Sequence, residues 1–317
     1  MDPSVSALAL AYGADLALGD PRWWPHPIRA MGMVIAAGEQ VLRRLLRWER
    51  LAGLLLVVIV VGASYGLSWY GLQAARASSW ALGVALEIVL LFSCLSTRDL
   101  AAECRSVLSA LEADDLPLAR ARVGRIVGRD TPHLDGPEVV RATVETAAES
   151  TLDGIVSPLF YVVVGGAPLA IAYKAVNTLD SMIGHRSARY IRFGWAAAKL
   201  DTAANWLPAR LCVPLCVIAA WACGQRPMAA WRCALRDGRG GPVPNAAYPE
   251  AAMAGALGVR LGGTNWYEGA PVEMPCMGDA LQPLAPARIR EAIRLMYACS
   301  LTAFLAAIMM VAVRSRW

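Results

Sequence analysis

The sequence predicts an all-α, polytopic membrane protein with four to six spans, one or two of them broken or re-entrant, and with cytoplasmic helical segments. Two observations support this prediction: the composition and the long stretches without charge. Of the 317 residues, 57% are hydrophobic and 17% are charged, whereas soluble domains average roughly 45–50% and about 25%. The mean hydropathy is +0.43. These values exclude a disordered chain and a disulfide-rich secreted domain, and we expect residues 1–317 to form a single integral membrane domain.

Three stretches are expected to cross the bilayer, because a helical span needs about 20 mostly apolar residues. Residues 51–75 contain no charged side chain, and residues 77–97 contain only Glu87. Residues 295–313 are also uncharged. Each of the three is therefore predicted to be a membrane-spanning helix.

Three other apolar stretches are interrupted or short. Residues 154–173 are long enough to cross, but Gly165-Gly166-Ala167-Pro168 lies at their centre. Residues 211–225 are shorter and contain a proline, and residues 3–18 are also short. Because Gly and Pro interrupt helices, the first of these stretches is predicted to be broken or re-entrant.

Arginine residues predict which side of the membrane each polar segment faces, because cytoplasmic loops are enriched in Lys and Arg. Residues 19–50 contain six arginines, and residues 98–150 are also rich in arginine. Both segments are expected on the cytoplasmic side. A further basic cluster directly follows residue 173. A broken or re-entrant segment before it would keep that cluster on the same side, and irregular backbone is tolerated at membrane depth where it lines a protein cavity.

Two long polar segments separate the apolar stretches. Residues 98–150 are predicted to be a helical insertion on the cytoplasmic side, with a helical hairpin over 98–128 and a third helix that starts at Asp135. Residues 224–291 are rich in Gly and Pro. They are predicted to be a loop region around one helix near 249–259.

The net charge and the cysteine pattern exclude several other classes of protein. The net charge is +5, and all but two of the 30 basic residues are arginine, which suits a cytoplasmic membrane face or anionic substrates. No basic stripe alternates with aromatic residues, so no nucleic-acid partner is expected. The eight cysteines include no C-x-x-C pair, and the chain has three histidines. We therefore expect reduced, buried thiols rather than a zinc site. The sequence contains neither a P-loop nor a Rossmann glycine motif.

The third helix of the insertion carries Arg141, Glu145, Glu149 and Asp153 at successive i, i+4 positions. Like charges at this spacing cost roughly 0.2–0.5 kcal/mol per pair, and carboxylates beside a membrane are expensive unless they are paired or bound to a cation. A Mg²⁺ site is one interpretation, because hard oxygen ligands suit that ion. The other interpretation is a solvated helix face.

A second group of polar side chains follows the glycine-interrupted stretch. Lys174, Asn177 and Asp180 lie at helical spacing, where a lysine can neutralise a phosphate and a carboxylate can hold a metal or accept a proton. An equally simple interpretation is a lysine that reaches toward the membrane surface at the end of a helix. Further along, Asp201 and Asn205 share a helix face at i, i+4 spacing. Arg210 follows them.

Two loops present further candidate side chains. The segment 19–29 holds three prolines, so Asp20, His26 and Arg29 are expected to have little conformational freedom. The alternative is an ordinary interfacial turn anchored by Trp23-Trp24. Close to the predicted helix near 249–259, three more polar residues are candidates for ligand contact: Asn245, Glu250 and Arg260.

Several longer motifs occur in a fixed order along most of the chain. They occupy residues 19–21 and 25–29 (Gly-Asp-Pro and Pro-His-Pro-Ile-Arg), 128–131 (Gly-Arg-Asp-Thr), 149–154 (Glu-Ser-Thr-Leu-Asp-Gly), 158–161 (Pro-Leu-Phe-Tyr), 177–182 (Asn-Thr-Leu-Asp-Ser-Met), 193–201, 205–210 (Asn-Trp-Leu-Pro-Ala-Arg) and 248–263. Together they resemble the adenosylcobinamide-phosphate synthase family of cobalamin biosynthesis. One departure is Ala246-Ala247-Tyr248, where the family pattern is Ala-Gly-Trp.

The resemblance implies a multi-pass enzyme of the bacterial cytoplasmic (inner) membrane that joins adenosylcobyric acid to (R)-1-aminopropan-2-yl phosphate and consumes ATP. Ethanolamine phosphate stays open as the amine, and other late cobalamin-pathway membrane enzymes are expected partners besides the bilayer. On this hypothesis, Glu149, Asp153 and Asp180 hold Mg²⁺, and Asp201 is a further ligand or a base. The remaining candidates bind phosphate or substrate: Asp20, His26, Arg29, Lys174, Asn177, Asn205, Arg210, Asn245, Glu250 and Arg260.

Two other classes of function are compatible with a polytopic chain. A non-catalytic inner-membrane signalling protein of the same superfamily would have no need for carboxylates at the membrane boundary. A transporter of an anionic solute would use the interruption at Gly165-Gly166, because transporters place broken helices at their binding sites.

Overall fold

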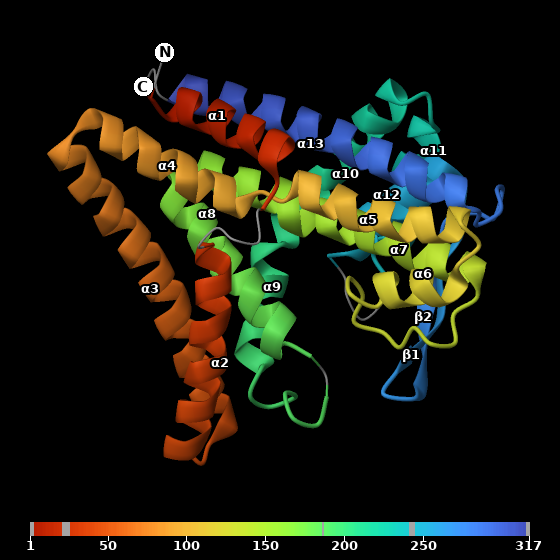
Figure 1. Cartoon of the computed structure of the whole chain (residues 1–317), viewed down its shortest axis with the longest axis horizontal. Coiled ribbons are helices and arrows are strands. Elements are labelled where there is room, and N and C mark those ends of the chain that lie inside the picture. Colours follow the sequence, from red (N-terminus) through yellow and green to blue (C-terminus); the bar gives the residue numbers. More distant parts are fainter. Residues whose placement is uncertain (1–2, 21–25, 186, 241–244, 315–317) are drawn as a thin grey trace. The chain divides into compact units, whose positions relative to one another are not determined.

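The computed structural model describes residues 3–20, 26–185, 187–240 and 245–314, and it is almost entirely helical (Figure 1). The described chain divides into two compact units. The first unit comprises residues 1–96, 157–206 and 304–317, and the second comprises residues 97–156 and 207–303. Trp23-Trp24, the expected interfacial anchor, lies outside the described residues. The expectation of a single membrane domain stays a prediction.

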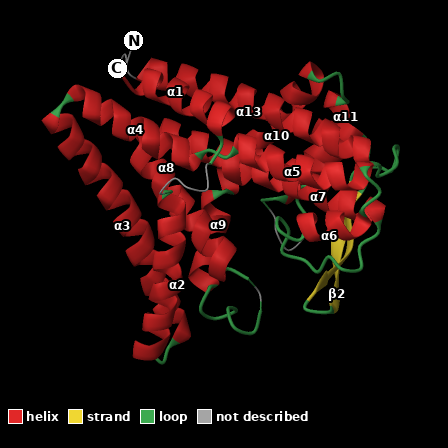
Figure 2. Ribbon diagram, viewed as in Figure 1, coloured by secondary structure: helices red, strands yellow, loops and turns green. Residues whose placement is uncertain are grey.

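The helices of the two units, with one β-hairpin, account for most of the described residues (Figure 2). The first unit contains α1 (Pro3–Leu18), α2 (Pro27–Leu45), α3 (Glu49–Ser78), α4 (Trp80–Cys94), α8 (Ser157–Ile183), α9 (Trp195–Ala204) and the end of α13 (Pro286–Arg314). The second contains α5 (Thr97–Glu112), α6 (Leu116–Val123), α7 (Gly136–Thr151), the π-helix η1 (Leu152–Val156), α10 (Trp206–Ala222), α11 (Pro227–Asp237), α12 (Ala247–Leu257), β1 (Leu261–Tyr267), β2 (Ala270–Met277) and most of α13.

The described part of the structure has four or five candidate membrane spans, which agrees with the predicted four to six. Four helical stretches of the described chain are long and apolar enough to cross a membrane, and a fifth candidate is the bent pair α9 and α10. The four are Glu49–Ser78, Trp80–Glu112, Gly136–Ile183 and Pro286–Arg314. On α3, Leu54, Val58 and Ile59 are exposed. Exposed apolar side chains in such a row are expected to face lipid.

The interruption predicted at Gly165-Gly166 is present in the backbone. Gly166 has φ 71° and ψ −166° inside α8, a conformation that is easy only for glycine. The helix resumes directly, with Pro168 in its first turn. The bent pair lies elsewhere, at α9 and α10, whose axes differ by 44°. The direction in which each segment crosses the membrane stays a prediction.

The hairpin of α3 and α4 explains how an acidic residue is accommodated in an apolar stretch. Glu87 in α4 is 5% exposed, and its Oε2 accepts a hydrogen bond of 2.8 Å from Arg76 at the end of α3. The Ser79 side chain caps the start of α4 by accepting from the Leu82 N–H. A buried carboxylate is tolerable when a cation neutralises it, so the ion pair keeps the α4 sequence compatible with a span.

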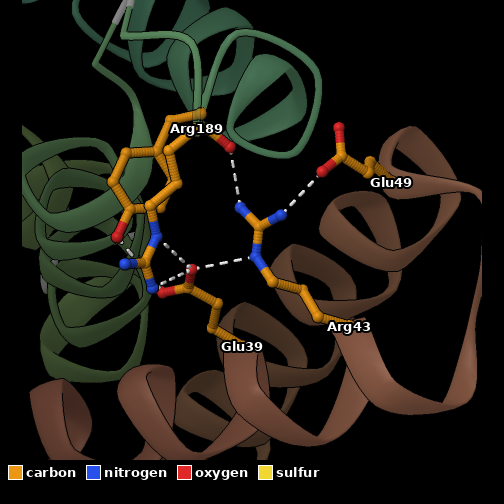
Figure 3. A network of polar contacts seen from close by, with 5 residues as sticks. Glu39, Arg43, Glu49 and Arg189 are labelled. Carbon is orange, nitrogen blue, oxygen red and sulfur yellow. Dashed lines mark hydrogen bonds and ion pairs between the residues drawn. The ribbon is translucent and has the colours of Figure 1, made fainter.

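A polar network attaches the segment between α8 and α9 to α2 (Figure 3). The buried Glu39 carboxylate accepts from Arg43 Nε at 2.9 Å and from Arg189 Nη2 at 3.0 Å. The hydroxyl of Tyr190 also donates to Glu39, and Arg43 bonds Glu49 at 2.7 Å. Arg43 Nη2 donates to the Arg189 carbonyl. Because both arginines share one carboxylate, the basic cluster after α8 is held by specific contacts.

The insertion 98–150 forms the helices that the sequence predicted. Asp115 caps α6 by accepting from the Leu118 N–H at 2.9 Å. Asp135 and Glu138 form a capping box at the start of α7, with bonds of 2.8 and 2.9 Å. These local caps are why the boundaries could be read from the sequence. The cytoplasmic location of the insertion stays a prediction.

The region 224–291 contains more regular structure than the predicted loops around one helix. Helix α11 precedes α12, and β1 pairs with β2 in an antiparallel hairpin whose last pair is Tyr267 and Ala270. Glu268 and Gly269, with φ 52° and 78°, form the two-residue turn. Positive φ at both central positions is the hairpin geometry that matches the strand twist. Glycines and prolines inside the strands obscured the hairpin in the sequence.

Gly53→Ala is expected to lower the free energy of unfolding by about 1–3 kcal/mol, the usual cost of overpacking. A Cβ atom at Gly53 in α3 would lie 1.7 Å from the Phe193 carbonyl oxygen, so the backbone before α9 must move. The measurement is the thermal unfolding midpoint in detergent, followed by tryptophan fluorescence. The matched control is Gly62→Ala in the same helix, where a Cβ meets nothing within 4 Å. Equal midpoints for the two variants would contradict this packing.

Candidate functional site

The second unit contains a small polar cavity of about 140 Å³. Five described segments contribute to it: the loop before α7, α7 itself, Gly240 after α11, the start of α12 and the β-hairpin. Its charged lining residues are Arg129, Glu145, Glu149 and Glu250. Three carboxylates therefore face one guanidinium group around the cavity.

Glu145 is the buried centre of a charge network on one wall of this cavity. It is 4% exposed, and it pairs with Arg129 and, at 3.5 Å, with Arg141. Its Oε1 also accepts from the Gly262 N–H at 2.8 Å. Asn265 Oδ1 accepts from both arginines, at 2.7 and 3.0 Å. These contacts join α7 to β1 and stabilise the cavity wall, so Glu145 has a structural role in the acidic stripe.

The other two carboxylates of the cavity have different surroundings. Glu149 is exposed and lies one turn after Glu145 on α7. Glu250 lies in the first turn of α12, and its backbone N–H bonds the Ala246 carbonyl. Its carboxylate makes no hydrogen bond or ion pair with the residues that the structure describes. Burial raises the pKa of the Glu250 carboxyl well above its usual range, and the charges of Glu149 and Glu145 raise it further while Arg129 lowers it. A cation in the cavity would favour the ionised form of Glu250.

The cavity also has apolar lining residues. Met274 and Met277 from β2 and Ala246 and Ala247 at the start of α12 line it. Met277 packs with Ala247 in a buried cluster. The cavity therefore combines acidic with apolar lining residues, which suits a small ligand with a cationic and an aliphatic part.

Asp153 lies in a π-helical segment that follows α7. The segment η1 covers Leu152–Val156, and the Leu152 N–H bonds the carbonyls of both Ala148 and Glu149. π-Helical turns occur frequently at functional sites because the inserted residue changes which side chains face a ligand. This turn interrupts the simple i, i+4 stripe that the sequence predicted between Glu149 and Asp153.

A second polar cluster lies in the first unit, on α8 and α9. Lys174 Nζ donates to Asn177 Oδ1 at 3.2 Å. The buried Asn205 accepts from Ser157 and Tyr173 at 2.6 and 3.0 Å, and its Nδ2 donates to Asp201 at 3.1 Å. The predicted pair Asp201 and Asn205 is therefore in contact.

Asp180 lies near the end of α8, in the same unit as Lys174. A Cβ atom at Gly184 would lie 2.0 Å from Asp180 Oδ1, so the chain passes very close to this carboxylate. Glu149 and Asp153 belong to the second unit. A metal site that uses Glu149, Asp153 and Asp180 together stays a prediction.

The three candidates of the N-terminal loop lie together. Arg29 Nη2 donates to Asp20 Oδ1 at 2.7 Å, and His26 Nε2 lies 3.9 Å from Asp20 Oδ2. His26 also caps α2, because its Nδ1 accepts from the Ile28 N–H at 3.3 Å. The structure brings these three side chains together, while their restricted conformational freedom and their contact with a substrate stay predictions.

The remaining candidates are Arg210, Asn245 and Arg260. The Arg210 guanidinium lies 4.8 Å from the centre of the Tyr248 ring. Asn245 is buried before α12, next to the cavity-lining Ala246, whereas Arg260 is exposed just before β1. Of the second unit's candidates, Glu149 and Glu250 are the two whose side chains line the cavity.

Sequence reasoning did not single out Arg129 or Asn265, although both help to form the cavity wall. Arg129 belongs to the Gly-Arg-Asp-Thr motif, which could have marked it as a functional residue. No motif marks Asn265 in this way. The structure also brings together the buried thiols of Cys212, Cys216 and Cys299. Within the described part of the chain, these are the only three metal-ligating atoms of His, Cys, Asp or Glu found within 4.8 Å of one another.

Comparison with known proteins finds one family along most of the chain. A family model described as CobD/Cbib protein matches residues 8–296. A Geobacter metallireducens protein named cobalamin biosynthesis protein CobD is 49% identical over 296 residues, 93% of each chain. A Klebsiella pneumoniae protein of the same name is 43% identical over 297 residues, again 93% of each. Salmonella typhimurium cobalamin biosynthesis protein CbiB is 42% identical over 301 residues, 94% of each. No solved structure matches.

Proposed function

This chain belongs to the CobD/CbiB family of cobalamin biosynthesis proteins, and from that premise we propose that it is an ATP-dependent amide ligase. The reaction joins adenosylcobyric acid to (R)-1-aminopropan-2-yl phosphate and gives adenosylcobinamide phosphate. One observation carries the proposal. The segment Glu149–Gly154, which carries the resemblance to the synthase family, begins at the rim of the cavity and continues into the π-helical turn.

Amide formation from a carboxylate and an amine needs the acid to be activated, since hydroxide is a poor leaving group. ATP with Mg²⁺ supplies this activation by transferring a phosphoryl group to the carboxylate. Glu149 and Asp153 fit Mg²⁺ because they offer hard carboxylate oxygens on adjacent turns, and Glu149 lines the cavity. Asp180 is the third proposed ligand.

We assign the other candidate residues to two roles: they neutralise phosphate charge, or they orient the substrates and neighbouring side chains. Lys174 and Arg210 compensate phosphate charge, and Asp201, oriented by Asn205, is a further ligand or a base. Asn177 orients Lys174. Asp20, His26 and Arg29 contact substrate as one group, and Asn245 and Arg260 extend the polar surroundings of α12. Such residues accelerate a transfer mainly by holding the reacting groups in position.

The proposed location is the bacterial cytoplasmic membrane. The candidate spans support a membrane location, and the relatives named above are bacterial. The arginine-rich segments favour a cytoplasmic active site, where ATP is present. Other membrane enzymes of the late cobalamin pathway are proposed partners.

The proposal is tested by incubating the purified protein with adenosylcobyric acid, aminopropanol phosphate and Mg²⁺·ATP. We expect a product whose mass equals the two substrates minus one water, with ADP released in equal amount. Parallel reactions with ethanolamine phosphate identify the preferred amine. Folded protein that forms no product would overturn the ligase. Flux of an anionic solute into proteoliposomes without amide formation would instead indicate a transporter.

A further inference from the structure

We propose that the cavity of the second unit binds the ammonium group of the amine substrate, and that Glu250 accepts the proton which this group must lose. The inference rests on the proposed function, since it assigns one substrate of that reaction to a place in the fold. The cavity measures about 140 Å³, well above the ~10–15 Å³ of this measure that holds one water molecule. It therefore has room for a small aliphatic ammonium group.

The charges around the cavity favour a cation. Glu145, Glu149 and Glu250 face it, and among the lining residues that the structure describes Arg129 is the one cation. Arg129 is already bonded to Glu145 and Asn265. Glu250 has no described partner, and the charges of Glu149 and Glu145 on α7 oppose its ionisation. The other titratable group at the cavity is the phenol of Tyr267 on β1. A bound cation would supply the missing counter-charge.

An ammonium group suits the acidic side chains that line the cavity. It donates three diverging hydrogen bonds at about 2.7–2.9 Å, which carboxylate oxygens accept.

The apolar lining residues suit the remainder of the amine. Met274 and Met277 also line the cavity, and their side chains adapt to small aliphatic groups. Glu149 is exposed at the rim, on the helix that leads to Asp153. An amine bound with its nitrogen toward Glu250 and its alkyl part on the methionines would extend its phosphate toward the rim.

The proposed step moves a proton from the ammonium group to Glu250 and then forms the amide bond. The ammonium nitrogen gives one proton to the Glu250 carboxylate, which frees its lone pair. The lone pair attacks the carbonyl carbon of the activated corrinoid acid, an acyl phosphate formed with ATP in the proposed reaction. The C–N bond forms and the C–O bond to phosphate breaks, so phosphate leaves with that electron pair. The second nitrogen proton leaves with the phosphate.

Binding measurements test the ammonium site without catalysis. Calorimetric titration of the full-length protein in detergent compares (R)-1-aminopropan-2-yl phosphate with propan-2-yl phosphate, which lacks the amine. We expect the wild type to bind the amine at least about tenfold more tightly, as for a charge-assisted hydrogen bond. Glu250→Gln should lose this preference and leave the affinity for propan-2-yl phosphate unchanged. The control is Glu268→Gln, at an exposed residue of the hairpin turn. This variant should keep the wild-type preference for the amine.

Kinetics tests the role of Glu250 as the base. Glu250→Gln should lower kcat for amide formation by about 10²–10⁴-fold, and its rate should recover as rising pH supplies free amine. Equal wild-type affinity for the two phosphates would overturn the inference, and so would undiminished kcat in Glu250→Gln. A raised Mg²⁺ requirement with unchanged amine binding would make Glu250 a metal ligand instead. A wild type that binds the amine but forms no amide would overturn the ligase and leave the binding site standing.

Discussion

Asp153→Asn is expected to lower cobyrate-dependent ATP turnover by about 100-fold or more, the usual loss when one group that stabilises the transferred charge is removed. The substitution preserves shape and removes one negative charge, so the helix and its insertion in the membrane should be unaffected. Glu149→Gln should also lower cobyrate-dependent ATP turnover. Both residues lie where α7 passes into the π-helical turn beside the cavity. The measurement is ADP release with and without adenosylcobyric acid.

The matched control for this prediction is Asp114→Asn. Asp114 is exposed between α5 and α6 with φ 55°, a conformation that Asn also adopts readily. Its turnover should equal that of the wild type. Near-normal turnover in both Asp153→Asn and Glu149→Gln would contradict the assignment of these carboxylates to Mg²⁺.

Glu145→Ala is expected to destabilise the second unit by about 3–5 kcal/mol, as when one partner of a buried ion pair is removed. Glu145 is 4% exposed, pairs with Arg129 and Arg141, and accepts a hydrogen bond from the Gly262 N–H. Without it, two arginines with side chains exposed by only 8–9% lose their carboxylate. The thermal midpoint should fall, and the amide protons of β1 should exchange faster with deuterium.

A suitable comparison is Glu268→Ala in the exposed hairpin turn, since surface substitutions usually change stability by about 0.5 kcal/mol or less. Activity should be lost in Glu145→Ala because the cavity wall is disordered, not because a reacting group is missing. If Glu145→Ala and Glu268→Ala unfold at the same temperature, the network does not support the fold.

The helical part of the fold could be predicted from the sequence because its signals are local. Runs of apolar residues marked α3 and α13, and Asp115 and Asp135 marked the starts of α6 and α7. Each signal depends on residues within one or two turns. Glu87 is the one charge in the run that marked α4, and its partner Arg76 lies only 11 residues earlier in the chain.

The cavity could be predicted only in part, because its walls depend on contacts between distant segments. The acidic stripe on α7 was visible, but its division into a paired Glu145 and an exposed Glu149 depends on Arg129 and on β1, which starts more than 100 residues later. The hairpin itself was missed because glycines and prolines interrupt the alternation of its strands. Glu250 was a candidate from its motif alone, and its lack of a partner appears only in three dimensions.

The hairpin strand beside the cavity also carries a natural attachment point for a reporter. Among the described cysteines, Cys276 is the one exposed thiol, and it lies between the cavity-lining residues Pro275 and Met277. A thiol-reactive fluorophore would therefore label the wild-type chain first at a position adjacent to the cavity. Occupancy of the cavity could then be followed optically in the native protein, without engineering a new cysteine or removing the buried ones.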